Sequence, residues 1–177
     1  GRAQRALKVA GVGEGDRVCG IAANTPEAIV GMLAVSSLGA IWSSCSPDFG
    51  VQGILDRFGQ IEPKVLIAVD GYYYNGKTIN ILDKVAEVRG QLPSVTRVVV
   101  VPYVHPEASL SAIASGVWWG DFLRPFATEE PSFLRLPFNH PLYILFSSGT
   151  TGVPKCIVHG AGGTLLQHMK EQQLQCD

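Results

Sequence analysis

Short apolar runs alternate with amphipathic stretches along the first part of the chain. The runs cover residues 17–23, 40–44, 65–69 and 95–101. Runs that are apolar throughout predict strands buried on both faces, and the amphipathic segments between them predict helices. Strands that alternate with helices indicate an α/β fold, in which a mostly parallel sheet carries helices on both faces.

Start and stop signals bound the first helices. Residues 1–11 are predicted to be the end of a helix that Gly11 terminates. A second helix is predicted to begin at Pro26, with Thr25 as its N-cap, and to end at Gly39. One face of this helix carries Ile29, Val30, Leu33, Ala34 and Leu38.

Two further helices are predicted before the fourth strand. Asp48 is expected to cap one of them, and Pro63 follows its end. The other is predicted over residues 79–88, with Gly90 as its terminator. The chain therefore continues the alternation of strand and helix as far as residue 101.

Residues 102–141 break this alternation. They are rich in proline, have little periodicity, and are predicted to form an irregular excursion with one short helix near residues 109–115. Trp118 and Trp119 are expected to pack on the core. After this excursion and two more apolar runs, residues 160–163 lead into a last amphipathic helix.

Composition and charge exclude several kinds of partner. The chain is 46% hydrophobic and 16% charged, with a formal net charge of −1, which argues against nucleic acid or an anionic membrane surface. No apolar run is long enough to span a bilayer. The N-terminus has neither an initiator Met nor a signal peptide, so we expect it to lie inside a longer chain. Nothing in the composition indicates an oligomeric state.

The four cysteines have no spacing typical of a metal site. They are Cys19, Cys45, Cys156 and Cys176. We expect reduced thiols, a cytosolic location, and neither a metal site nor a disulfide framework.

Residues 147–155 carry the strongest candidate chemistry. This segment reads Ser147, Ser148, Gly149, Thr150, Thr151, Gly152, Val153, Pro154 and Lys155. It lies between predicted strands at residues 143–146 and 156–158. Glycines let the backbone approach an anion, successive N–H and hydroxyl groups can wrap phosphate oxygens, and a lysine adds charge. The segment predicts a polyphosphate site, although a ligand-free turn is the simpler alternative.

Residues 71–78 are a rival phosphate site. The sequence GYYYNGKT matches the pattern G-x-x-x-x-G-K-[ST] between a predicted strand and a predicted helix. Three consecutive tyrosines are bulky for a loop that must wrap phosphates with its backbone. An exposed aromatic turn is therefore favoured, with Lys77 available as a point charge. A nucleotidase or kinase that uses this loop stays open as an alternative.

The position of a loop in the sheet gives further candidates. Ligands of parallel sheets bind beyond the carboxyl ends of the strands, so the loops after residues 23, 44, 69 and 146 are candidate sites. Ser46 lies in one of these loops. The simpler interpretation, which these residues alone favour, is a plain strand-to-helix turn with Asp48 as the helix cap. His159 follows an apolar run, where a packed histidine is commoner than a catalyst.

The segment FSSGTTGVPK at residues 146–155 resembles the phosphate-loop signature of adenylate-forming enzymes, which include acyl-CoA synthetases and luciferases. Further segments are similar to the acetyl-CoA synthetase branch and, within it, to the acetoacetyl-CoA synthetases. They are residues 24–28, 39–50, 61–64, 69–72 and 160–166. The resemblance implies that residues 1–177 are part of a large N-terminal AMP-binding domain, without the small C-terminal domain.

The resemblance also implies an activity. Such enzymes are acid–thiol ligases that use ATP, Mg²⁺ and coenzyme A, here with acetoacetate or a similar short-chain acid. The acid forms an acyl-adenylate, and the thiol of coenzyme A then displaces AMP. We expect Ser147, Ser148, Gly149, Thr150, Thr151, Gly152 and Lys155 to hold the ATP phosphates. Lys155, Thr150 and Thr151 are the expected catalytic residues, and most ligands of Mg²⁺ are expected outside residues 1–177.

The same resemblance gives the rival segment another role. In the acetyl-CoA synthetases, two basic residues in the loop that corresponds to residues 72–78 contact the nucleotide phosphate of coenzyme A. Lys77 keeps one of these charges, Tyr74 replaces the other, and Ser46 lies in a second segment near coenzyme A. The whole protein is thus expected to be an enzyme, while residues 1–177 alone are expected to be inactive.

Overall fold

The computed structural model describes residues 1–147 and 152–176. In chain order its elements are α1 (Arg2–Val9), β1 (Arg17–Ile21), α2 (Pro26–Ser37), β2 (Ile41–Cys45), α3 (Val51–Phe58), β3 (Val65–Val69), β4 (Gly71–Tyr74), β5 (Lys77–Asn80), α4 (Leu82–Gln91), β6 (Arg97–Val101), β7 (Gly116–Trp118), α5 (Trp119–Leu123), β8 (Pro141–Ser147), β9 (Lys155–Gly160) and α6 (Ala161–Gln175).

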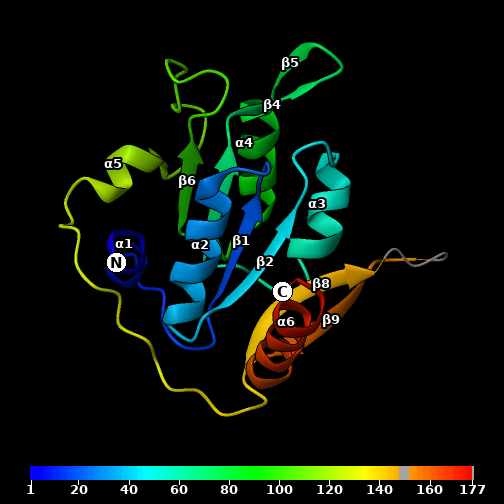
Figure 1. Cartoon of the computed structure of the whole chain (residues 1–177). Coiled ribbons are helices and arrows are strands. Elements are labelled where there is room, and N and C mark those ends of the chain that lie inside the picture. Colours follow the sequence, from blue (N-terminus) through cyan, green and yellow to red (C-terminus); the bar gives the residue numbers. More distant parts are fainter. Residues whose placement is uncertain (148–151, 177) are drawn as a thin grey trace.

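The described strands form a mostly parallel sheet. Its order is β7-β6-β3-β1-β2-β8-β9, and every neighbouring pair is parallel except β8 and β9. Helices α1, α2 and α5 lie on one face, and α3 and α4 pack together on the other (Figure 1). This arrangement confirms the predicted α/β fold. A separate antiparallel pair, β4 and β5, extends beyond the sheet.

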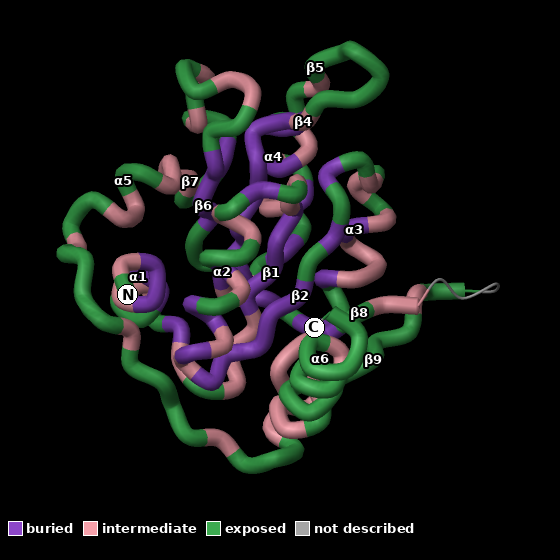
Figure 2. Tube along the Cα trace, in the orientation of Figure 1, coloured by how far each residue is buried: buried purple, intermediate pink, exposed green. Residues whose placement is uncertain are grey.

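The core lies around the central strands. All five residues of β3 are buried, and the β-branched run of β6 is buried except for Arg97 at its start. Figure 2 shows burial concentrated in these strands, whereas β9 and α6 are mostly exposed. Trp118 and Trp119 are partly buried against the core, as predicted. No described helix has the length and apolarity that crossing a membrane requires.

The predicted helix near residues 109–115 is wrong. These residues form turns, and the excursion instead contains β7 and α5 a few residues later. The Ser109 hydroxyl accepts the Ser111 backbone N–H at 3.3 Å and donates to the Ser111 hydroxyl at 3.0 Å. Local hydrogen bonds of this kind compete with helix formation.

Helix boundaries are right at α2 and wrong at α3 and α4. Thr25 is the N-cap residue of α2 and Pro26 its first residue, although the Thr25 side chain makes no capping hydrogen bond. Gly50, not Asp48, is the N-cap of α3. Gly90 lies inside α4, which continues to Gln91. Helix α4 starts at Leu82, not at residue 79, because residues 77–80 pair with β4 as a strand.

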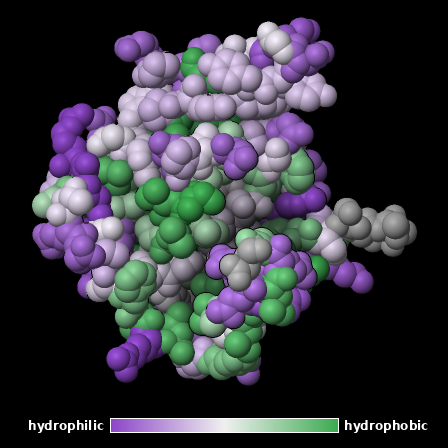
Figure 3. Space-filling view, in the orientation of Figure 1, coloured by the Kyte–Doolittle hydropathy of each residue, from purple (hydrophilic) through white to green (hydrophobic). Residues whose placement is uncertain are grey.

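The predicted apolar face of α2 is largely exposed. Ile29, Val30 and Leu33 are about half exposed or more, whereas Gly31, Ala34 and Val35 pack inward. A Cβ on Gly31 would lie 3.2 Å from Ile67 Cδ1, so the small residue lets the helix approach the sheet. Figure 3 shows hydrophobic side chains gathered over α2 as a result.

Candidate functional site

The predicted phosphate segment joins two antiparallel strands. Ser147 at the end of β8 is paired with Lys155 at the start of β9, and the Lys155 residue is exposed. Gly152 has a φ of +93°, a conformation that favours glycine. The predicted residues Ser148, Gly149, Thr150 and Thr151 lie outside the described residues.

Contacts at both ends hold the base of this segment. The buried Ser43 hydroxyl of β2 donates to the Ile144 carbonyl of β8 at 2.7 Å. At the other end, Gln60 Nε2 donates to the Pro154 carbonyl at 2.9 Å, and Cys156 Sγ lies 3.5 Å from Gln60 Oε1. Gln60 was not among the predicted site residues, because nothing in the local sequence links it to a segment 94 positions away.

The rival segment is a β-hairpin. β4 and β5 are antiparallel, with Tyr74 opposite Lys77. Asn75 and Gly76 have φ values of +48° and +73°, as in the turns that close two-residue hairpins. A phosphate-binding loop of the G-x-x-x-x-G-K-[ST] type requires a strand, a loop and a helix. The structure contradicts the nucleotidase or kinase alternative, because residues 77–80 form a strand where that loop would lead into its helix.

Ser46 lies in the turn between β2 and α3, and Lys84 of α4 holds that turn. Lys84 Nζ donates to the carbonyls of Pro47 and Phe49 at 2.8 Å each. Burial lowers the pKa of Lys84, and the negative charge of Asp48 opposes this effect. The pattern gave no signal for this role, because Lys84 occupies an ordinary polar position of a helix.

The hairpin and the Ser46 turn lie at the same end of the sheet. Asn80 ends β5, and its Oδ1 accepts the Leu82 N–H at 2.8 Å at the start of α4. Lys84, two residues further along, reaches the Ser46 turn. The start of α4 therefore links the two segments that were expected to bind coenzyme A.

The phosphate segment is separate from these two. The Ser46 turn precedes the first residue of α3, whereas Gln60, which contacts Pro154, follows the last. The eight residues of α3 span about 12 Å. In Figure 1 the tip of β8 and β9 lies to the side of the sheet, whereas β4 and β5 lie at its upper end. β8 pairs with β2 in parallel, in register at Trp42 and Tyr143, so the phosphate segment follows the carboxyl end of its strand.

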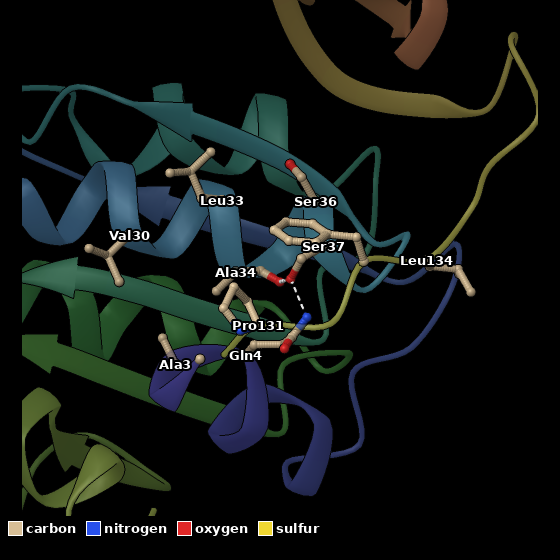
Figure 4. Close-up of a pocket in the computed structure, with 11 residues that line it drawn as sticks. Ala3, Gln4, Val30, Leu33, Ala34, Ser36, Ser37, Pro131 and Leu134 are labelled. Carbon is tan, nitrogen blue, oxygen red and sulfur yellow. Dashed lines mark hydrogen bonds between the residues drawn. The ribbon is translucent and has the colours of Figure 1, made fainter. Parts of the chain in front are cut away.

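The described surface has pockets elsewhere. One, of about 430 Å³, lies between β8, β9 and α6 and includes Tyr143, His159 and His168. Burial raises the pKa of the Tyr143 hydroxyl. Another, of about 480 Å³, is lined by apolar residues of α1, α2 and the segment 131–134 (Figure 4). Gln4 crosses its floor and donates to the Ser37 hydroxyl at 2.7 Å.

Comparison with known proteins gives a consistent result. The sequence profile of the AMP-binding enzymes matches residues 2–176. The chain is 57% identical over 176 residues to the acetoacetyl-coenzyme A synthetase of Rhizobium meliloti (strain 1021), covering 99% of this chain and 27% of that protein. It is 45% identical over 182 residues to the malonamoyl-CoA synthetase vrtB of Penicillium aethiopicum, covering 99% and 25%.

A solved structure is also similar to this chain. The acetoacetyl-CoA synthetase from Streptomyces lividans superposes with a TM-score of 0.89 at 44% identity, covering 99% of this chain and 27% of that one. The chain thus spans about a quarter of the length of these relatives. Its sequence and fold place it in the family of AMP-binding enzymes.

Proposed function

We propose that this chain is part of an acid–thiol ligase that uses ATP and coenzyme A to convert acetoacetate into acetoacetyl-CoA. One observation carries the proposal: nearly the whole chain aligns with acetoacetyl-CoA synthetases, and the aligned region includes SSGTTGVPK at residues 147–155. The pairing of Ser147 with Lys155 supports a loop that begins and ends at one point and can enclose a polyphosphate.

The reaction would proceed in two balanced steps. A carboxylate oxygen of acetoacetate attacks the α-phosphorus of ATP, and the bond to pyrophosphate breaks. The sulfur of coenzyme A, after loss of its proton, then attacks the acyl carbon, and AMP leaves. In the first step negative charge accumulates on the departing pyrophosphate, where fixed donors and cations are most effective.

The predicted residues take roles in this first step. Lys155 would supply positive charge, and Ser147, Ser148, Thr150 and Thr151 would supply hydroxyl groups. Gly149 and Gly152 would allow a close approach of the backbone; the positive φ of Gly152 supports this role. Among residues 1–147 and 152–176, no three His, Cys, Asp or Glu side chains gather as a metal site.

Coenzyme A would bind at the other end of α3. Lys77 and Tyr74 are exposed at the tip of the β4–β5 hairpin, and Ser46 lies in the turn that Lys84 holds. Lys77 would contact the nucleotide phosphate as a point charge. The free thiols of all four cysteines support a cytosolic location as part of this proposal.

Exchange of labelled pyrophosphate into ATP, dependent on acetoacetate, tests the proposal in the complete protein. Lys155→Ala should slow this exchange strongly, whereas Lys77→Ala should leave it unchanged and raise the KM for coenzyme A. Lys8→Ala, at an exposed position of α1, is the matched control and should change neither. Loss of exchange in Lys77→Ala together with normal exchange in Lys155→Ala would refute the assignment.

A related substrate is the second candidate, because a malonamoyl-CoA synthetase is also similar over 99% of this chain. Acetoacetate and malonamate differ only in a terminal methyl or amino group on the distal carbonyl. Exchange assays with each acid as the substrate distinguish the two candidates by their kcat/KM.

A further inference from the structure

Asp70 is a buried acid directly before the β4–β5 hairpin. It follows the last residue of β3, and it is the one charged residue among the buried polar residues of the described chain. Its Oδ1 accepts the backbone N–H groups of Tyr103 and Val104, each at 2.9 Å, and its Oδ2 accepts that of His105 at 2.7 Å. Three charge-assisted hydrogen bonds from consecutive residues offset the cost of burying this carboxylate.

The backbone of Asp70 connects further segments. Its N–H donates to the Val101 carbonyl at 3.1 Å, and its carbonyl accepts the Ile81 N–H at 3.0 Å, where the hairpin returns to α4. The next residue, Gly71, leaves no room for a side chain, because a Cβ there would lie 2.3 Å from Val104 Cγ2 and 2.4 Å from the Ile79 carbonyl oxygen. The base of the β4–β5 hairpin is therefore fixed against residues 103–105.

The same residues support one face of the hairpin. Side chains alternate between the faces of a β-ribbon, so Tyr73 and Thr78, which are paired, lie on the face opposite to Tyr74 and Lys77. The Tyr73 ring meets the Tyr103 ring edge to face, with centroids 5.5 Å apart. Residues 103–105 thus contact the back of the hairpin, and Tyr74 and Lys77 occupy its free face.

We infer that Asp70 is a positioning residue for the phosphorylated nucleotide of coenzyme A. Its carboxylate holds residues 103–105 behind the hairpin, and these residues set the direction in which Lys77 projects at the end of the sheet. This inference rests on the proposed function, in which Lys77 contacts the nucleotide phosphate. Asp70 itself touches no substrate, since its side chain is fully enclosed.

The test is Asp70→Asn in the complete protein, with coenzyme A and dephospho-coenzyme A, which lacks the 3′-phosphate, as alternative substrates. The amide replaces one acceptor oxygen with a donor, so hydrogen bonds to residues 103–105 are lost. We expect the KM for coenzyme A to rise about tenfold. The KM for dephospho-coenzyme A should change less, and the same difference between the two substrates is expected for Lys77→Ala. The rate of acetoacetate-dependent pyrophosphate exchange should stay within about twofold of that of the unmodified protein.

Asp83→Asn is the control, since Asp83 is an exposed acid in the first turn of α4. An unchanged preference for coenzyme A over dephospho-coenzyme A in Asp70→Asn would overturn the inference, and so would an equal loss of both half-reactions. If Asp70→Asn does not fold, Tyr103→Ala takes its place, with Tyr103→Phe as control, because it removes only the ring that supports Tyr73. For this pair, a higher KM for coenzyme A in Tyr103→Ala alone supports the inference, and equal KM values overturn it.

Hydrogen exchange separates this inference from the proposed function. The amides of Tyr103, Val104 and His105 should exchange at least about tenfold faster in Asp70→Asn, with the β4–β5 hairpin affected next and β1 unaffected. Unchanged exchange at these amides would overturn the positioning role whatever the enzyme's substrate. If the unmodified protein shows no acetoacetate-dependent exchange of pyrophosphate into ATP, the proposed function fails. The role of Asp70 is then decided by hydrogen exchange alone.

Discussion

Gly152→Ala should weaken ATP binding through the backbone alone. The φ of Gly152 is +93°, and among the residues that the structure describes no atom lies within 4 Å of a Cβ built on it, so the substitution introduces no steric contact with them. A residue with a side chain pays about 1–2 kcal/mol for a left-handed conformation. Without ATP the alanine can relax to negative φ, so binding must restore the strained conformation. The KM for ATP should rise about 5- to 30-fold.

Acetoacetate-dependent pyrophosphate exchange at varied ATP concentration measures this effect. Gly90→Ala is the matched control: the site is equally open, but Gly90 lies in α4, where alanine is favoured by about 0.5–1 kcal/mol. Gly152→Asn should recover part of the loss, because asparagine tolerates left-handed conformations better than alanine does. An ATP KM within twofold of normal for Gly152→Ala, or an equal rise for Gly90→Ala, would refute the reasoning.

Three further predictions concern buried side chains and their exposed counterparts. Phe58→Ala should lower the free energy of unfolding, measured by urea denaturation, by about 3–5 kcal/mol, because Phe58 is fully buried. Phe133 is 74% exposed, so the control Phe133→Ala should change this free energy by less than about 0.5 kcal/mol. Iodoacetamide should modify Cys156 in the native protein, but Cys19 and Cys45 only after unfolding, as mass spectrometry would show; early modification of Cys45 would contradict its burial. Burial raises the pKa of Cys45 from 9.0 to about 12, so its contribution to stability is complete below pH 9 and is lost between pH 9 and about 12.

The sequence predicted the parts of the fold that depend on local patterns. Residues 65–69 are an uninterrupted apolar run, and β3 has these bounds. Pro26 after a capping position predicted the start of α2. Periodicity did not predict which face of α2 packs inward. The inward face is the one with Gly31, because a residue without a side chain lets the helix lie close to the sheet.

The candidate site was predictable only in part, for a similar reason. The residues that carry charge, Lys155 and Lys77, stand in recognisable motifs. The residues that position them act over long sequence separations: Asp70 contacts residues 33–35 positions away, and Gln60 contacts a residue 94 positions away. Residues 71–78 match a lysine-containing loop motif, but they also contain the pair Asn75-Gly76, which favours a two-residue hairpin turn. The structure has the hairpin.

The attachment of β8 to β2 has a consequence for folding kinetics. The hydrogen bond from Ser43 to Ile144 joins residues 101 positions apart, whereas β1, β2, β3 and β6 follow one another closely in sequence. Contacts between distant residues require a larger loss of chain entropy before they give any stabilisation. During synthesis, which proceeds from the N-terminus, the parallel core can form before β8 has been made. The strand that leads into residues 147–155 is then added to an existing sheet edge, in a late step of folding.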